Sequence, residues 1–495
     1  MKQRIFWTIS ILAIAIAAGC YFFPKDTDVL SQRYAPNQLQ QDFQVFREVL
    51  EKAHPALYSY ADKNELNHDF DSIYAGLKDD ADIRSFHQKL AFIVNKIGCS
   101  HTNLYLPKIL YDTLLHRPNF FPLPVVYVDG GFYINSDISE IPVGSHIISI
   151  NGNPAAQIME RMYDYNVPDG RNKNYNLSQA AQHFSYDYFM AYGPAGVFRI
   201  EYVAPGSTTR EMVALEPVTL EKYTDEYNTN VYYNYSDEVG YDFEIIDSLH
   251  TAVLTLRSFA FSTATTFSAY KNFLLNAFTL LKNENGINNL VIDCRNNEGG
   301  EYENIFLLLR FLSKQPFREV DSAKVRFRKT PYQQYLEPAY ALNERPYLDS
   351  MLKTEFHPLG DGTFALNETE NDLRRPHPMA FTGNLFVITN SNVVSAASNF
   401  VAMIKDSKRG IIVGEQTGGG YNAHNGFTRL LYKLPNTGMQ LEFSAVQVQH
   451  FLHHPQFNRY GVEPDYTISN TIHDIIENQD PQMSFIVNNL VKADR

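Results

Sequence analysis

The sequence predicts a multi-domain α/β protein, in which a helical N-terminal region and a β-rich region precede a larger α/β domain with a mainly parallel sheet. Three observations predict this order. Apolar residues recur at helical spacing before residue 98, short strand-like runs separated by turn residues follow, and strand-like segments alternate with helix-like ones from about residue 240. The chain has 495 residues, 44% of them hydrophobic, which is enough for several packed cores.

The first twenty residues are typical of an export signal. Lys2 and Arg4 precede an apolar run from Ile5 to Ala18, and Cys20 follows a glycine. This ending resembles a bacterial lipobox, which implies a signal peptide over residues 1–19 and a lipid on Cys20. An uncleaved membrane anchor and ordinary secretion remain alternatives. All three place the bulk of the chain outside the cytoplasm, in the periplasm or as an outer-membrane lipoprotein of a bacterial cell envelope.

Charge and cysteine content exclude some classes of protein. The net charge is −13 and no run is rich in Lys or Arg, so we expect no nucleic-acid partner. If Cys20 is acylated, only Cys99 and Cys294 remain, and we expect both in a core. No disulfide framework and no metal site are indicated by these spacings.

Residues 34–116 are expected to form a helical domain. Two apolar stripes at helical spacing are Leu39, Phe43, Phe46 and Leu50, and then Ile83, Phe86, Leu90, Ile93 and Ile97. Gly98 stands where a helix C-terminal glycine belongs. His101 to Leu106 is expected to be a short strand.

Residues 120–220 are expected to form a PDZ-like domain. Asp129-Gly130-Gly131 lies between two strand-like runs and predicts a hairpin. The stretch from Pro142 to Gly152 resembles the "xxGDxIxxINGxx" segment of PDZ domains, with Ser145 in place of the usual Asp. Any small β-domain with an Asn-Gly turn is the alternative.

The remaining chain alternates between strands and helices. The expected strands are Thr251–Leu256, Leu290–Asp293, Leu385–Thr389 and Ile411–Gly414, and the expected helices are Tyr270–Lys282, Asn304–Leu312 and Ala396–Lys405. This alternation predicts βαβ units and a mainly parallel sheet. Residues 314–380 form a polar, Tyr- and Pro-rich insertion, which we expect to be a lid or a substrate-binding flap.

Three loops beside these elements could carry chemistry. Asp293 to Gly300 follows a buried strand and ends in paired glycines, which allow a ligand to approach the backbone. Ser395 lies at a helix entrance, where its own N–H and that of Ala396 could stabilise an oxyanion, although most such serines only cap helices. Gly414 to Gly420 lacks the Lys-Ser/Thr ending of a P-loop, so we exclude nucleotide binding.

Taken in order, these segments resemble peptidase family S41, which includes tail-specific proteases, the tricorn protease core and the interphotoreceptor retinoid-binding proteins. The family patterns are "D-x-R-x-N-x-GG" at Asp293 to Gly300, "T-x-x-x-x-S-A-A-E" at Asn390 to Ser398 with Ser398 replacing Glu, "G-E-x-T-x-G" at Gly414 to Gly419, and "G-V-x-P-D" at Gly461 to Asp465. The resemblance covers roughly residues 36–475. It implies a ClpP/crotonase-like catalytic domain over residues 240–475, preceded by the PDZ-like one.

The resemblance implies an acyl-transfer serine peptidase without a cofactor. Ser395 would be the nucleophile, and the N–H groups of Gly299 or Gly300 with Ala396 would form the oxyanion hole. Tail-specific members use a Ser–Lys dyad, but the lysine position falls at Gly420 here, and no lysine follows it.

The tricorn branch uses a Ser–His pair, and Ser100-His101 stands in the corresponding place. His101 would be the general base, because an imidazole accepts a proton near neutrality, and Ser100 would orient its ring. That branch also has a carboxylate near its C-terminal motif. Asn458 occupies roughly that place, so Glu415 and Glu463 are the nearest candidates, and we take Glu415 as the fourth residue.

The sequence thus predicts an extracytoplasmic serine peptidase acting on peptide or unfolded protein substrates, held at a membrane by its lipid or anchor. The alternative is a catalytically inactive protein on an S41 scaffold that binds peptides or hydrophobic ligands. The histidines His450, His453 and His454 are expected to lie in a solvated loop without a metal.

Overall fold

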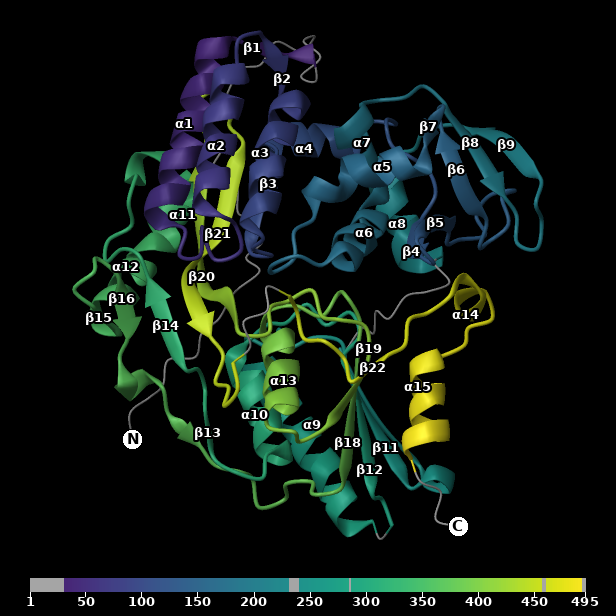
Figure 1. Cartoon of the computed structure of the whole chain (residues 1–495), viewed down its shortest axis with the longest axis vertical. Coiled ribbons are helices and arrows are strands. Elements are labelled where there is room, and N and C mark those ends of the chain that lie inside the picture. The colour runs from purple at the N-terminus through teal and green to yellow at the C-terminus, as the bar shows by residue number, and fades with distance from the viewer. Residues whose placement is uncertain (1–30, 231–239, 285, 456–459, 492–495) are drawn as a thin grey trace.

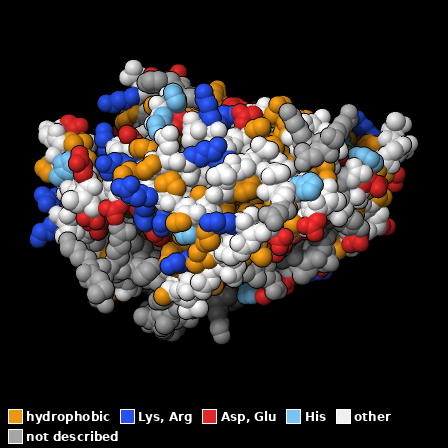
Figure 2. Space-filling view, turned by 90° about the horizontal axis from the view of Figure 1, so that it is seen from below, with side chains coloured by type: hydrophobic (Ala, Val, Ile, Leu, Met, Phe, Trp, Pro, Cys, Tyr) orange, Lys and Arg blue, Asp and Glu red, His pale blue; other side chains and the backbone are white. Residues whose placement is uncertain are grey.

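The computed structural model describes residues 31–230, 240–284, 286–455 and 460–491. The leader with Cys20, and Asn458, lie outside these residues. Figure 1 shows a helical region at the upper left, a β-rich region at the upper right and an α/β layer below. Figure 2 shows the lower face, where acidic and basic side chains are interspersed with hydrophobic ones. Within the described ranges, no helix combines the length and apolarity needed to cross a bilayer.

The N-terminal region is helical because its two apolar stripes are buried in one common core. Its helices are α1 (Pro36–Ala53), α2 (Lys63–Gly76), α3 (Ile83–Ile97) and α4 (Lys108–Leu115). Strand β1 (Arg33–Tyr34) pairs with β2 (Ala81–Asp82), and β3 (Thr102–Tyr105) follows α3. Gly98 ends α3 with a φ of +67°, a conformation that favours glycine. The turn that follows Gly98 presents Ser100 and His101.

The insertion, which the sequence predicts to be a lid or a substrate-binding flap, folds into short strands and helices. It contains β13 (Phe317–Arg318), β14 (Ser322–Val325), α11 (Pro338–Asn343), α12 (Arg345–Thr354), β15 (Phe356–Pro358), β16 (Phe364–Leu366) and β17 (Leu373–Arg374). Strand β14 pairs with β21 (Gln440–Gln449), which also pairs with β20 (Ala423–Lys433) and with β3. The insertion therefore shares one apolar core with the N-terminal helices, because its hydrophobic residues are buried against them.

The β-rich region is a six-stranded antiparallel sheet with helices packed on it. Its strands are β4 (Val125–Val128), β5 (Gly131–Ile134), β6 (His146–Ile150), β8 (Phe198–Val203) and β9 (Arg210–Leu215), and the short β7 (Asn153–Pro154) pairs with β6. Its helices are α5 (Ala155–Met162), α6 (Lys173–Gln182) and α7 (Phe184–Tyr192). An antiparallel bridge between Phe120 and Val218 joins the two ends of the region before α8 (Leu220–Asn230).

The α/β layer is a six-stranded sheet, and its mainly parallel character confirms the predicted fold class. The strand order is β10 (Tyr241–Ile246), β11 (Thr251–Leu256), β12 (Asn289–Asp293), β18 (Asn384–Thr389), β19 (Ile411–Gly414) and β22 (Tyr466–Thr467). Only the β10–β11 pair is antiparallel. The carboxyl ends of β12, β18 and β19 meet at one edge, where their loops form a common surface.

Helices cover both faces of this sheet. One face packs on α9 (Ala264–Asn283), α10 (Tyr302–Leu312) and α13 (Ser395–Asp406). The other packs on α15 (Pro481–Phe485) and a π-helical turn (Ile486–Leu490) of the C-terminal segment. The short α14 (Ile472–Ile476) lies instead against Gly144 of the β-rich region. Strand residues alternate between the two cores, so that Leu254 faces one and Val253 the other. The described sheet core thus extends beyond residue 475, to Val491.

Candidate active site

Ser395 begins α13 in a strained backbone conformation. Its φ is +54°, which a non-glycine residue adopts at a cost of about 1–3 kcal/mol. The helix continues behind it through small buried residues, Ala396 and Ala397, while Ser395 itself is only half-buried. The sharp strand-to-helix turn therefore holds the hydroxyl at the surface of the α/β layer.

Hydrogen bonds between two loops hold this turn in place. The Val394 N–H donates to the Asn297 carbonyl at 3.2 Å. Asn390 and Asn296 also exchange two hydrogen bonds, one from the Asn296 N–H at 2.9 Å and one from the Asn390 side chain at 2.6 Å. The loop after β12 therefore supports the loop that carries Ser395.

A buried ion-pair network anchors the loop after β12. Arg295 donates to both carboxylate oxygens of Asp293 and also contacts Asp480. Burial raises the pKa of Asp293, but Arg295 and Arg257 outweigh that effect and hold the pKa well below its usual range. The aspartate and arginine of the "D-x-R" pattern thus act as a brace for the loop.

The structure brings His101 to Ser395. Its Nε2 lies 3.0 Å from the Ser395 Oγ, and its Nδ1 lies 3.1 Å from the Ser100 Oγ. Burial lowers the pKa of His101, and Asp169 and Glu442 partly oppose this effect. A neutral imidazole whose Nε2 accepts the Ser395 hydroxyl proton is therefore the favoured state at neutral pH.

The carboxylate that faces Ser100 and His101 is Asp169, which the sequence prediction missed. It lies in the β-rich region, between the 3-10 turn of Tyr163–Tyr165 and α6, and is 1% exposed. Its Oδ1 accepts the Ser100 N–H at 2.9 Å. Within the sequence, Asp169 is one acidic residue in a polar loop, and no pattern distinguishes it.

Glu415, the carboxylate expected from the sequence, is placed differently. Its Oε2 accepts the Ser391 N–H at 3.3 Å, and its backbone pairs with Thr389. It therefore supports the loop before Ser395, and no hydrogen bond joins it to His101 within the described residues. Nearness to a family pattern along the chain had favoured Glu415, but this residue, the first after β19, directs its side chain to the Ser391 loop.

The three residues expected to form the oxyanion hole surround Ser395 unequally. A Cβ on Gly299 would lie 2.8 Å from the Ser395 Cβ and 2.9 Å from the Ala396 nitrogen. The Gly299 N–H already donates to the Asn297 side chain at 2.9 Å. The N–H groups of Gly300 and Ala396 have no acceptor within the described residues. The N–H groups of Gly300 and Ala396 are therefore available to an oxyanion, whereas that of Gly299 is engaged.

A second group of histidines lies behind His101. Contrary to the solvated loop expected for it, His450 is buried, and its Nε2 lies 2.6 Å from the Nδ1 of His424. The His424 Nε2 accepts the Tyr302 hydroxyl, and its ring stacks on that of His101 with centroids 5.9 Å apart. Burial lowers the pKa of His424 well below its usual value, so this neighbour of His101 stays neutral.

One group of described residues has the composition of a metal site. Ligand atoms of Cys99, His101 and Asp169 lie within 4.8 Å of one another. Both ring nitrogens of His101 and the Asp169 oxygens are, however, engaged in hydrogen bonds within the protein. A metal ion here would have to displace those bonds, so the geometry favours a hydrogen-bonded site.

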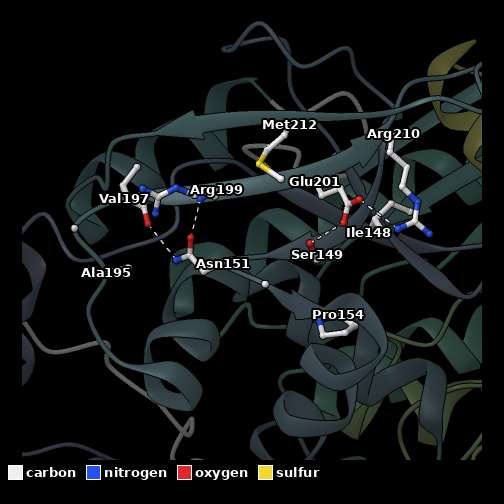
Figure 3. Close-up of a pocket in the computed structure, with 12 residues that line it drawn as sticks. Ile148, Ser149, Asn151, Pro154, Ala195, Val197, Arg199, Glu201, Arg210 and Met212 are labelled. Atoms are coloured by element: carbon white, nitrogen blue, oxygen red, sulfur yellow. Dashed lines mark hydrogen bonds and ion pairs between the residues drawn. The ribbon is translucent and has the colours of Figure 1, made fainter.

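A groove of about 900 Å³ lies on the sheet of the β-rich region, and Figure 3 shows its lining. Ser149 and Arg210 both bond to Glu201, at 3.0 and 3.2 Å. Met212 stands beside them and is 70% exposed. None of the Ser395 group lines this groove, and its Glu201 already has partners within the protein, so we assign no ligand to it.

Comparisons with known proteins agree with this geometry. A model of peptidase family S41 matches residues 250–468, and no curated protein matches the sequence. Mature CPAF complexed with lactacystin is 17% identical, with a TM-score of 0.64, and the match covers 92% of this chain and 98% of that one. A serine-to-alanine mutant of CPAF is 16% identical, with a TM-score of 0.65, and the match covers 92% and 97%.

At these identities the solved structures show a shared fold alone. The match to the family model is separate evidence, because it includes the loops after β12, β18 and β19 and the "G-V-x-P-D" segment, all within residues 250–468. The "G-V-x-P-D" segment packs closely on the loop after β19. The Thr417 N–H donates to the Val462 carbonyl, and a Cβ on Gly461 would lie 1.8 Å from the Thr417 carbonyl oxygen. Over residues 250–468, the chain matches peptidase family S41.

Proposed function

We propose that the protein is a serine peptidase that cleaves peptide or unfolded protein substrates through an acyl-enzyme on Ser395, with His101 as general base. The observation that carries this proposal is the 3.0 Å contact between the His101 Nε2 and the Ser395 Oγ. This distance lies within the range required for transfer of the hydroxyl proton. The two residues are separated by 294 positions in the sequence.

In the acylation step, the Ser395 Oγ attacks the peptide carbonyl carbon while His101 takes the hydroxyl proton. The N–H groups of Gly300 and Ala396 donate to the oxyanion that forms. The C–N bond then breaks, and His101 returns the proton to the departing amine. In the second step, a water molecule gives a proton to His101 and its oxygen attacks the acyl carbon. The C–O bond to Ser395 then breaks, His101 returns the proton to the Ser395 Oγ, and the carboxylic acid product leaves.

A histidine base also explains why no lysine is needed. Gly420, at the lysine position of the Ser–Lys branch, is buried, and its N–H points to Asp169 at 3.4 Å. A Cβ at this position would lie 2.3 Å from the Ala423 oxygen, so a lysine does not fit without a backbone shift. The proposal therefore assigns proton transfer to His101.

Covalent labelling tests this proposal directly. A fluorophosphonate probe should modify the wild-type protein at Ser395, located by peptide mass spectrometry, because the probe needs an activated serine. Ser395→Ala should remove the adduct. Ser407→Ala is the matched control, because Ser407 ends the same helix and bonds only to backbone carbonyls of that helix. A folded wild type that is not labelled would favour the binding-protein alternative.

We also propose that Cys20 carries a lipid and that the protein acts outside the cytoplasm. The basic residues, the apolar run and the Ala-Ala-Gly-Cys ending of the leader support this proposal. Intact-mass analysis of the membrane-extracted protein should show a chain that begins at Cys20 with an acyl adduct. A Cys20→Ser chain should lack the adduct. A mature chain that retains Trp7 would point to an uncleaved anchor instead.

A further inference from the structure

We propose that Asp169 is a positioning residue that acts through Ser100 to hold His101 in the tautomer and orientation needed to accept the Ser395 proton. This inference rests on the proposed function and adds a residue from the β-rich region to the site. The family resemblance had suggested a carboxylate near the C-terminal motif, and the structure supplies one from another region.

The contacts of Asp169 all lie around the Ser100–His101 turn. The Oδ1 accepts the Ser100 N–H at 2.9 Å, and the Oδ2 accepts the Gly420 N–H at 3.4 Å. The Ser100 hydroxyl also lies near this carboxylate and favours its charged form. Because Asp169 is 1% exposed, little water competes for these bonds.

The direction of the hydrogen bonds follows from the Asp169 carboxylate, which can only accept. With its hydroxyl proton directed to Asp169, the Ser100 Oγ is left to accept from the His101 Nδ1, 3.1 Å away. The Nδ1 therefore carries the ring proton, and the Nε2 is free to accept from Ser395. When His101 becomes charged during the reaction, the negative charge of Asp169 stabilises it.

Hydrogen bonds to two segments outside the β-rich region hold the loop that carries Asp169 in place. The Asp169 N–H donates to the Gly418 carbonyl at 2.9 Å, and the Gly170 N–H donates to the Gly98 carbonyl at 2.8 Å. The Asn172 side chain donates to the Thr417 carbonyl at 3.1 Å. The loop of residues 167–172 thus joins the Ser100–His101 turn to the glycine loop after β19, which makes the carboxylate an integral part of the site.

Asp169→Asn is the sharpest test, because asparagine has the same shape and can still accept the Ser100 N–H. We expect kcat on an unfolded protein substrate to fall by about 10- to 100-fold, with KM little changed. We also expect the acidic limb of the kcat/KM profile to move to lower pH, because Asp169 is the charge that most opposes the lowering of the His101 pKa by burial. A merely structural role would not move this limb.

Asp164→Asn is the matched control. Asp164 also lies in the β-rich region and accepts a hydrogen bond from the N-terminal helices, from Asn95 at 2.6 Å, but it does not contact Ser100 or His101. We expect this variant to keep the wild-type kcat and acidic limb. Thermal unfolding of all variants checks that each is folded.

Ser100→Ala and the double variant test the route of the effect. If Asp169 acts through Ser100, the double variant should lose little more kcat than the Asp169→Asn variant alone. Should Asp169→Asn fail to fold, Ser100→Ala still decides, because a wild-type kcat in that variant overturns the proposal. If the wild type is active and the Asp169→Asn variant has the same kcat and the same acidic limb, the proposal is also overturned. A wild type that fluorophosphonate does not label overturns the peptidase assignment instead.

Discussion

The α/β layer and the N-terminal half contribute to the site in different ways. The α/β layer supplies Ser395 and the amides of Gly300 and Ala396 from loops that directly follow parallel strands. The N-terminal half supplies Ser100 and His101 from a turn after a helix, and Asp169 from a loop 69 residues further along. The first contribution is local along the chain, whereas the second depends on the docking of separate segments.

This difference shows where a sequence pattern carries information. A strand, a glycine-rich turn and a helix entrance are determined by neighbouring residues, so their motif can be read directly. A base and a carboxylate need only the right position in space, and two unrelated loops can provide them. The following predictions test how far the two halves depend on each other.

The largest effect is expected for Ser395→Ala, in the α/β half. Loss of the nucleophile should lower kcat/KM by about 10⁴-fold or more, because no neighbouring serine takes its place at the His101 Nε2. Turnover of an unfolded protein substrate measures this change, and the melting temperature shows whether the fold is kept. Undiminished turnover would remove Ser395 from the reaction.

The next effect is expected for His101→Ala, in the N-terminal half. Loss of a general base should lower kcat/KM by about 10²- to 10⁴-fold. Burial lowers the pKa of His101, so the wild-type acidic limb should lie below the usual histidine value of about 6.5, with activity rising as pH increases through it. The pH–rate profiles of both proteins measure this. A variant with near-full activity and the same limb would show that another group is the base.

A smaller effect is expected for Gly299→Ala, at the boundary between the halves. The added methyl would lie 2.8 Å from the Ser395 Cβ at a φ of +97°, so it should displace the nucleophile and cost about 10²-fold in kcat. Gly362→Ala is the control, because Gly362 has a φ of +86° and open space around it. Equal losses in both variants would mean that backbone strain, and not the contact with Ser395, causes the effect.

The smallest effect is expected for Asp187→Asn, in the β-rich region. Burial raises the pKa of Asp187 from 3.8 to about 8, although Asn166 donates to it at 2.6 Å. The folded protein therefore keeps this proton up to about pH 8, whereas the unfolded chain loses it near pH 4. The free energy of unfolding consequently falls as the pH rises from about 4 to about 8.

Asp187→Asn should remove that pH dependence and be more stable than the wild type at pH 8, by about 1 kcal/mol or more. Urea unfolding at pH 5 and at pH 8 measures the difference. Activity of the folded protein should be unchanged, because Asp187 contacts none of the Ser395 group. Parallel stability profiles in the two proteins would show that Asp187 is ionised when buried.

The sequence by itself determined the α/β layer and the loops that lead to Ser395. The strands Thr251–Leu256 and Ile411–Gly414 lie where their apolar runs predicted them, and α9 begins only six residues before its predicted start. These elements depend on burial patterns within ten or so neighbouring residues. The Ser100–His101 pair was predicted from its place in a family pattern, and the structure brings it to Ser395.

Only the tertiary structure decided which carboxylate faces the histidine and what the insertion does. Asp169 and Glu415 are both acidic residues in loops, and the difference between them is that the loop of residues 167–172 docks on the Ser100 turn. His450 was expected in a solvated loop, yet it is buried, and the hydrophobic residues of the insertion are buried by partners distant in the sequence. The physical reason is that burial of a polar residue depends on hydrogen-bond partners from other segments, which local patterns do not contain.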